Sequence, residues 1–271
     1  MALKIRMTGS CVAAGWSEDE KRKHRDRKDP AKRGRIKGFS AGARKRLATF
    51  IASCEPMGLP VLLTLTLPGD FDSNPDTWKR YMRAFYQRME RRYPAVRWVE
   101  RLEFQKRGAP HWHVAAWGLG EVTSQLHREV AGHWFEVVGS GDVRHLRAGT
   151  RVEEPRSAAA WVTYMCKEFA KGCQVLHAGA VQAMFPETSL GRWWTVRGKA
   201  KMTLEACREF TVDLDRWEEV ADLLDDYGRS RGLKFMQRLG SYVGWSVLPR
   251  ELLERCWRIL GLGLVPTVSP A

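Results

Sequence analysis

Two histidines separated by one residue are the feature of this sequence that most clearly suggests chemistry. His111 and His113 lie in a stretch of alternating apolar residues. Such alternation is typical of a β-strand, in which residues two apart point to the same face. Two neighbouring imidazoles could supply half of a metal site. The same pattern also arises by chance in strands that bind no metal, so the pair alone leaves both interpretations open.

A carboxylate on the preceding segment could complete the site. Residues 106–110, Lys-Arg-Gly-Ala-Pro, have the composition of a hairpin turn, so residues 97–105 are expected to form the partner strand. Strand alternation places Glu103 on the face that meets the histidines across this hairpin. The pattern therefore predicts a three-ligand site made of Glu103, His111 and His113.

A tyrosine further along the chain could act together with such a metal. Residues 156–171 are expected to be helical, and Tyr164 and Lys167 share one face of that helix. A phenol has an ordinary pKa of about 10, so it keeps its proton at neutral pH and needs activation to become a nucleophile. The metal could polarise a phosphate, and Lys167 could hold that phosphate or stabilise the phenolate. The alternative is that Tyr164 only packs in the core.

Apolar periodicity predicts the elements that would position these residues. The expected strands are 60–67, 97–105, the segment after residue 110, 143–146 and 192–196, and the expected helices are 75–93, 123–138 and 156–171. Strands and helices mixed around an antiparallel hairpin indicate an α+β fold with a central antiparallel sheet flanked by helices. We expect this domain to span residues 47–200, and a helical C-terminal region to span residues 201–271.

The positive charge is concentrated near the start of the chain. The net charge is +14, and residues 1–46 hold 15 Lys and Arg against 5 Asp and Glu. The basic run 21–37 has almost no apolar periodicity, so residues 1–46 are expected to form a flexible basic arm. A solubilising tail is one interpretation, and contact with phosphates of a nucleic acid, weakened by salt, is the favoured one.

Several classes of protein are disfavoured by what the sequence lacks. The six cysteines form no Cys-x-x-Cys pair, and Cys166, Cys173 and His177 are too loosely clustered to indicate a zinc site. Scattered cysteines without a signal peptide favour a reduced, cytoplasmic protein. No apolar run is long enough to predict a membrane span, so no membrane partner is expected. No P-loop motif occurs, so no fused ATP-driven helicase is expected.

The order of these features resembles the three motifs of the HUH endonuclease superfamily, specifically the rolling-circle replication initiators, or Rep proteins. The Thr-bearing strand Leu63–Thr66 comes first, His111-Trp112-His113 comes second, and Tyr164-Met165-Cys166-Lys167 comes third. The stretch Gly191-Arg192-Trp193-Trp194 also resembles the segment after the tyrosine helix in many plasmid and phage Reps. The resemblance covers roughly residues 58–200.

The resemblance implies a reaction and its partners. Glu103, His111 and His113 would bind one Mg²⁺ or Mn²⁺, with Gln105 as a second choice for the third ligand. Tyr164 would attack a phosphodiester of single-stranded origin DNA, giving a 5′-phosphotyrosine and a free 3′-OH that primes synthesis. Double-stranded origin DNA, a host helicase and a DNA polymerase are further candidate partners.

One departure from the family and two alternative functions stay open. Two-tyrosine members carry a second Tyr four residues away, where this chain has Ala160 and Glu168, so it resembles the single-tyrosine members. How replication would terminate is therefore not explained. An HUH-type transposase of a mobile element would use the same chemistry, whereas a non-catalytic DNA-binding protein would use only the basic arm and the helical tail.

Three aromatic residues and one carboxylate receive other roles. Strand parity turns Trp112 away from the histidines and into the core, and it turns Glu100 to that same opposite face. Trp193 and Trp194 alternate, so we expect one of them to be buried. The other could stack on a base of single-stranded DNA.

Overall fold

The computed structural model describes two compact units within this chain. The central unit is formed by residues 33–47 and 57–203, and the terminal unit by residues 1–32, 48–56 and 204–271. The residues described are 2–8, 11–17, 39–157, 161, 164–165, 181, 184–185, 190–230, 243–245 and 249–262.

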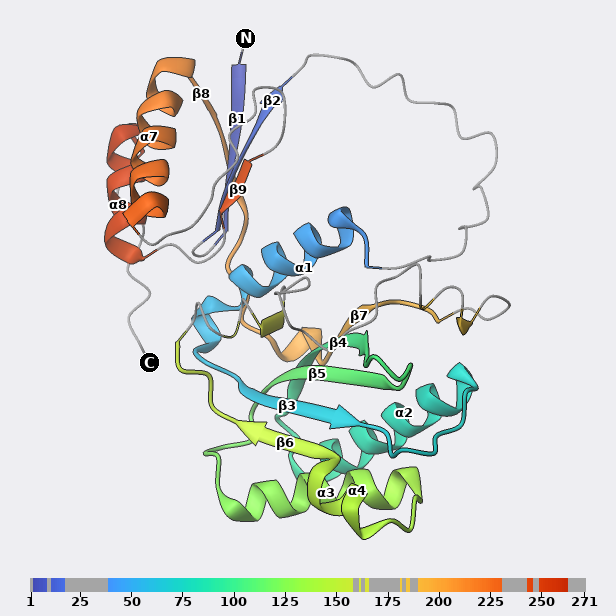
Figure 1. Ribbon diagram of the computed structural model, residues 1–271. Coiled ribbons are helices and arrows are strands. Elements are labelled where there is room, and N and C mark those ends of the chain that lie inside the picture. Colours follow the sequence, from blue (N-terminus) through green and yellow to red (C-terminus); the bar gives the residue numbers. More distant parts are fainter. Residues whose placement is uncertain are drawn as a thin grey trace, which may run out of the picture. The chain divides into compact units, whose positions relative to one another are not determined.

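A five-stranded antiparallel sheet forms the centre of the central unit, with strand order β6-β3-β5-β4-β7 (Figure 1). Its strands are β3 (Val61–Thr66), β4 (Arg97–Phe104), β5 (Pro110–Trp117), β6 (Thr150–Glu153) and β7 (Trp194–Arg197). The sheet and its flanking helices confirm the α+β fold predicted from the sequence.

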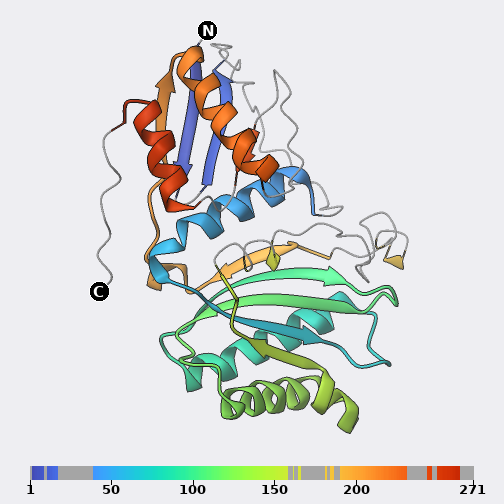
Figure 2. The same cartoon turned by 60° about the vertical axis from the view of Figure 1, so that its left-hand side comes forward.

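Three helices, α2 (Pro75–Arg92), α3 (Ser124–Val138) and α4 (Val143–Ala148), belong to the same unit. Helix α2 begins where the Asn74 side chain accepts a hydrogen bond from the backbone N–H of Asp76. Figures 1 and 2 show α2 and α3 on one face of the sheet. The core on that face includes side chains from both helices and from alternate strand positions: Trp78, Met82, Phe85, Trp134, Leu63, Leu65, Trp112 and Val114.

The alternation leaves the other strand positions on the second face of the sheet, which we call the histidine face. Thr64 and Thr66 on β3, Arg101 and Glu103 on β4, and His111 and His113 on β5 belong to it. The β4–β5 hairpin fixes their register through a turn in which Gly108 has φ +82°, a conformation that other L-residues rarely adopt.

The terminal unit contains a second antiparallel sheet with strand order β8-β1-β2-β9. Its strands are β1 (Ala2–Thr8), β2 (Cys11–Ser17), β8 (Arg208–Val212) and β9 (Val243–Trp245), and its helices are α7 (Leu214–Ser230) and α8 (Arg250–Ile259). A separate apolar core joins α7 and α8 through residues such as Val220, Leu224, Leu253 and Trp257. Helix α1 (Ala41–Ser53) contributes residues to both units, and the 3₁₀ turns are η1 (Glu55–Met57) and η2 (Lys199–Lys201).

Three segments differ from the sequence-based expectations. Residues 2–17, assigned above to the basic arm, form two strands, because apolar Leu3, Ile5 and Met7 alternate with polar residues. The C-terminal region contains β8 and β9 beside its helices. The predicted strand at 143–146 is wrong: this segment belongs to α4, which the Asp142 side chain caps. The basic run 21–37 lies outside the described residues.

None of the helices in the described part of the chain combines the length and apolar character needed to cross a membrane.

Candidate active site

Strand register brings the polar side chains of three strands together on the histidine face. His111 lies opposite Thr66 of β3 and Glu103 of β4, and His113 lies opposite Thr64 and Arg101. Directly opposed residues of antiparallel strands point to the same face. The local sequence alternation therefore determines which side chains meet here.

Glu103 is held in a buried ionic network. Its Oε2 lies 2.9 Å from His113 Nε2, and its Oε1 pairs with the guanidinium of Arg101. Burial alone would raise the pKa of Glu103, but the hydrogen bond with His113 and the positive charge of Arg101 outweigh it and hold that pKa below its usual value. Glu103 is therefore a carboxylate at neutral pH.

His111 is neutral at physiological pH. Burial, together with the nearby His113 and Arg107, lowers the pKa of His111 to about 4. Its Nδ1 lies 2.8 Å from Thr66 Oγ1, and its ring centroid is 4.7 Å from that of His113. A neutral imidazole keeps one nitrogen lone pair, which a metal ligand requires.

Tyr164 packs against His113 from a helical segment on this face. Its ring meets the His113 ring edge-on, with 4.4 Å between the centroids, and its hydroxyl lies 2.5 Å from Thr64 Oγ1. Burial raises the pKa of Tyr164 to about 12 in spite of the Thr64 contact, and the charges of Glu153 and Glu103 add to the increase. The phenol therefore stays protonated at neutral pH and needs activation before it can attack.

The neighbours of Tyr164 anchor this segment to the sheet. Met165 is fully buried, and its backbone oxygen accepts a hydrogen bond of 2.9 Å from Arg101 Nη1. Trp161 packs edge-on against Trp117 of β5, with 5.6 Å between ring centroids. Arg101 thus contacts both the carboxylate of Glu103 and the backbone beside Tyr164.

Two donors of this site are spaced like adjacent ligands of a divalent cation. Adjacent ligands of an octahedral ion at about 2.1 Å are about 3 Å apart, and His113 Nε2 and Glu103 Oε2 are 2.9 Å apart. The buried Nδ1 of His113 has no hydrogen-bond partner among the described residues. Across that same part of the chain, no group of three or more His, Cys, Asp or Glu side chains is arranged to hold a metal ion. Arg101 pairs with Glu103, and Thr66 contacts His111.

The structure brings four of the five predicted site residues together: Glu103, His111, His113 and Tyr164. The fifth, Lys167, lies outside the described residues, as do Cys166, Cys173 and His177. Gln105, the second choice as a ligand, instead accepts a hydrogen bond from Arg107 Nε at the hairpin turn.

Glu100 and Trp112 lie on the opposite face, as strand parity predicted. Hydroxyls of Tyr86 and Thr195 donate hydrogen bonds to Glu100, and Trp112 is buried against Trp134. Of the two consecutive tryptophans, Trp193 is buried and Trp194 is partly exposed.

Sequence reasoning assigned no role to Thr64, Thr66 or Arg101, all of which contact the predicted residues. Their positions in phase with Glu103 and the histidines were the signal that could have found them.

The fold and site together define an α+β domain in which one sheet face joins a His-x-His strand, a carboxylate and a tyrosine. Residues 60–172 match the family of the replication-associated protein ORF2. The matched segment includes Glu103, His111, His113 and Tyr164.

Three similar proteins are also named for replication. A "Putative replication protein" of Xylella fastidiosa strain 9a5c is 31% identical over 65% of this chain and 64% of its own length. A replication-associated protein of Pseudomonas phage Pf3 is 30% identical over 52% of this chain and 50% of its own length. A second Xylella protein of the same description, from strain Temecula1, is 29% identical over 60% and 61%. The chain thus spans less than two thirds of each of these relatives.

Proposed function

We propose that this protein initiates rolling-circle DNA replication by nicking and rejoining a single strand through Tyr164. The observation that carries the proposal is the contact of Tyr164 with His113, which itself contacts Glu103. The replication-associated family match covers this cluster and supports the replication role.

The reaction is a transesterification. The Tyr164 oxygen forms a bond to the phosphorus of a DNA phosphodiester, the phenolic proton is released, and the bond from phosphorus to the 3′ oxygen breaks. The leaving 3′ oxygen takes up a proton and becomes the 3′-OH that primes synthesis. One phosphoester bond replaces another, so the 5′-phosphotyrosine can be resealed without ATP.

The residues around the tyrosine have distinct tasks. Thr64 fixes the phenol through its 2.5 Å contact, and Arg101 keeps Glu103 ionised and ties it to the Tyr164 segment. A Mg²⁺ or Mn²⁺ ion bound by Glu103, His111 and His113 would polarise the phosphate and neutralise its developing charge. We assign Lys167 to hold the same phosphate.

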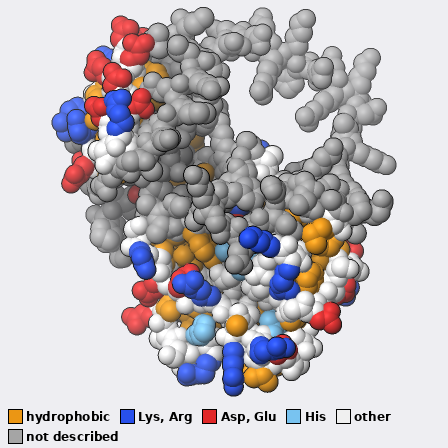
Figure 3. Space-filling view, in the orientation of Figure 1, with side chains coloured by type: hydrophobic (Ala, Val, Ile, Leu, Met, Phe, Trp, Pro, Cys, Tyr) orange, Lys and Arg blue, Asp and Glu red, His pale blue; other side chains and the backbone are white. Residues whose placement is uncertain are grey.

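Origin DNA, single-stranded and double-stranded, is the proposed substrate and partner. Figure 3 shows Lys and Arg side chains spread over the visible face of the central unit. The basic run 21–37 would add phosphate contacts whose strength falls with salt. We propose a host helicase as a later partner, since no P-loop motif is present in the sequence. A DNA polymerase is the second proposed partner, because it would extend the free 3′-OH.

A nicking assay with the Tyr164→Phe variant tests the proposal. Wild type should cleave a labelled single-stranded oligonucleotide from its own replicon, and Tyr164→Phe should not. The control is Tyr81→Phe, because Tyr81 lies on α2 and packs against the core rather than against the histidines. Cleavage by Tyr164→Phe at the wild-type rate would overturn the assignment. Cleavage only at the ends of a mobile element would favour the transposase alternative.

A further inference from the structure

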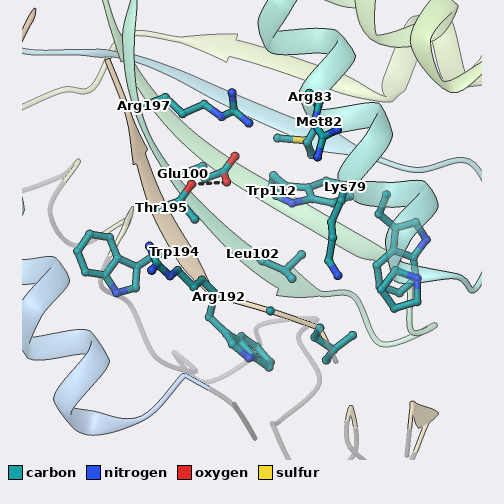
Figure 4. Close-up of a pocket in the computed structure, with 15 residues that line it drawn as sticks. Lys79, Met82, Arg83, Glu100, Leu102, Trp112, Arg192, Trp194, Thr195 and Arg197 are labelled. Carbon is teal, nitrogen blue, oxygen red and sulfur yellow. Dashed lines mark hydrogen bonds between the residues drawn. The ribbon is translucent and has the colours of Figure 1, made fainter. Parts of the chain in front are cut away.

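A pocket lies between the start of α2 and β7, on the sheet face opposite the histidines. Its volume is about 300 Å³, at the lower end of the range for small-molecule sites. We call it the β7 pocket (Figure 4). It is lined by Pro75, Trp78, Lys79, Met82, Arg83, Glu100, Leu102, Trp112, Leu190, Gly191, Arg192, Trp193, Trp194, Thr195 and Arg197.

Four tryptophans contribute to the lining of the β7 pocket. Trp78, Trp112 and Trp193 are buried, and Trp194 is partly exposed. A flat, apolar group such as a nucleobase gains stacking contact on surfaces of this kind.

Cations surround the entrance of the pocket. Figure 4 shows Lys79, Arg83, Arg192 and Arg197 around it, with Glu100 as the one carboxylate among the lining residues. Tyr86 and Thr195 already satisfy that carboxylate. Arg83 and Arg192 are exposed, and within the described part of the chain neither forms an ion pair, so both can meet a phosphate.

We infer that the β7 pocket binds a nucleotide, with its base against the tryptophans and its phosphate at one of the two exposed arginines of the lining, Arg83 on the α2 side or Arg192 on the β7 side. The nucleotide is either an unpaired unit of a DNA strand or a free nucleotide, since both present the same base and phosphate. The inference does not depend on nicking, because the pocket and the histidines are on different faces of the sheet.

Photocrosslinking to the full-length protein tests this inference and separates the two sources. The probes are a single-stranded oligonucleotide with one 5-iododeoxyuridine and free 5-iododeoxyuridine monophosphate, both with a chelator present to suppress nicking. Under ultraviolet light the iodinated base forms adducts with adjacent aromatic side chains, and peptide mapping locates them. An adduct at residues 192–197 supports the inference, and the probe that gives it identifies the source. No adduct there with either probe would overturn it.

A pair of double variants shows whether the arginines of the pocket contribute to nucleotide binding. Arg83→Ala with Arg192→Ala should weaken binding of the crosslinked probe about tenfold, as expected for charge-assisted hydrogen bonds lost at a partly exposed site. Arg91→Ala with Arg128→Ala removes the same charge from exposed positions outside the pocket and should change binding less than about twofold. Equal losses of binding in both double variants would show that only the net charge counts, and this would contradict a specific phosphate site in the pocket.

Discussion

Arg101 donates a hydrogen bond of 2.9 Å to the backbone oxygen of Met165, the residue next to Tyr164. The same guanidinium pairs with Glu103. Because both contacts are buried, the position of the tyrosine is coupled to that of the carboxylate. This coupling joins two parts of the site that are distant in sequence, since Arg101 and Met165 are 64 residues apart along the chain.

Replacing Arg101 by Lys should lower the activity although the positive charge is kept. A lysine keeps the positive charge but cannot place two nitrogens in the planar geometry that serves both partners. We expect Arg101→Lys to reduce formation of the covalent DNA adduct by about tenfold, the equivalent of one hydrogen bond of about 1.4 kcal/mol. The adduct rate and the thermal midpoint are the measurements, and a wild-type rate in a folded Arg101→Lys variant would contradict the coupling.

Acid should destabilise the metal-free protein through His111. Its folded pKa of about 4 lies below the ordinary value of 6.5, so between these values the unfolded chain binds a proton that the folded chain does not. The contribution of His111 to the free energy of unfolding is therefore fully present above pH 6.5. It falls as the pH drops toward 4, by about 2 kcal/mol at pH 5. Urea unfolding with a chelator at about pH 7.5 and pH 5 should show a smaller loss in His111→Gln. An equal loss in both proteins would show that another group titrates.

Divalent cations should stabilise the folded state if the donor set binds them. A ligand that binds only the folded chain raises its stability by mass action. We expect Mn²⁺ to raise the thermal midpoint of wild type by a few degrees, and to have no such effect on His113→Ala. His133→Ala is the matched control, because His133 lies on α3, away from the histidine face. The same Mn²⁺ shift in His113→Ala would remove His113 from the metal site.

Two glycines after β5 should differ in their tolerance of alanine. Both have positive φ, +86° at Gly118 and +78° at Gly120. A Cβ at Gly118 would lie 2.7 Å from the backbone oxygen of Ala95, whereas a Cβ at Gly120 meets nothing within 4 Å. Gly120→Ala should cost about 1 kcal/mol of unfolding free energy from backbone strain alone, and Gly118→Ala at least about 2 kcal/mol. Equal losses of unfolding free energy in the two variants would mean that the Ala95 backbone shifts away from the added methyl group at no cost.

Much of the central unit could be predicted because its strands and helices follow from residue patterns within short segments of the sequence. Alternation within a short hairpin assigns Glu103 and the two histidines to one face, and the 3.6-residue period identifies α2 and α3. The strand expected at 143–146 failed because its two apolar residues, Val143 and Leu146, are three apart, which fits one face of a helix and not the alternation of a strand. Asp142 just before it was the available helix-start signal.

The remaining features depend on contacts distant in sequence. The bond from Arg101 to Met165 spans 64 residues, and no pattern in either segment predicts it. The strands at 2–17 were missed because the high positive charge of residues 1–46 led to the prediction of a flexible arm, in spite of the apolar alternation of residues 2–8. Their partner strands β8 and β9 also lie near the other end of the chain.

The central claim is that Tyr164 becomes covalently linked to DNA, and the adduct itself tests it most directly. The full-length protein would be incubated with single-stranded DNA from its own replicon and Mn²⁺, digested, and analysed by mass spectrometry for a nucleotide-bearing peptide. The account predicts a 5′-phosphate on Tyr164 and no adduct in Tyr164→Phe. A nucleotide on any other residue, or cleavage with no covalent intermediate, would contradict it.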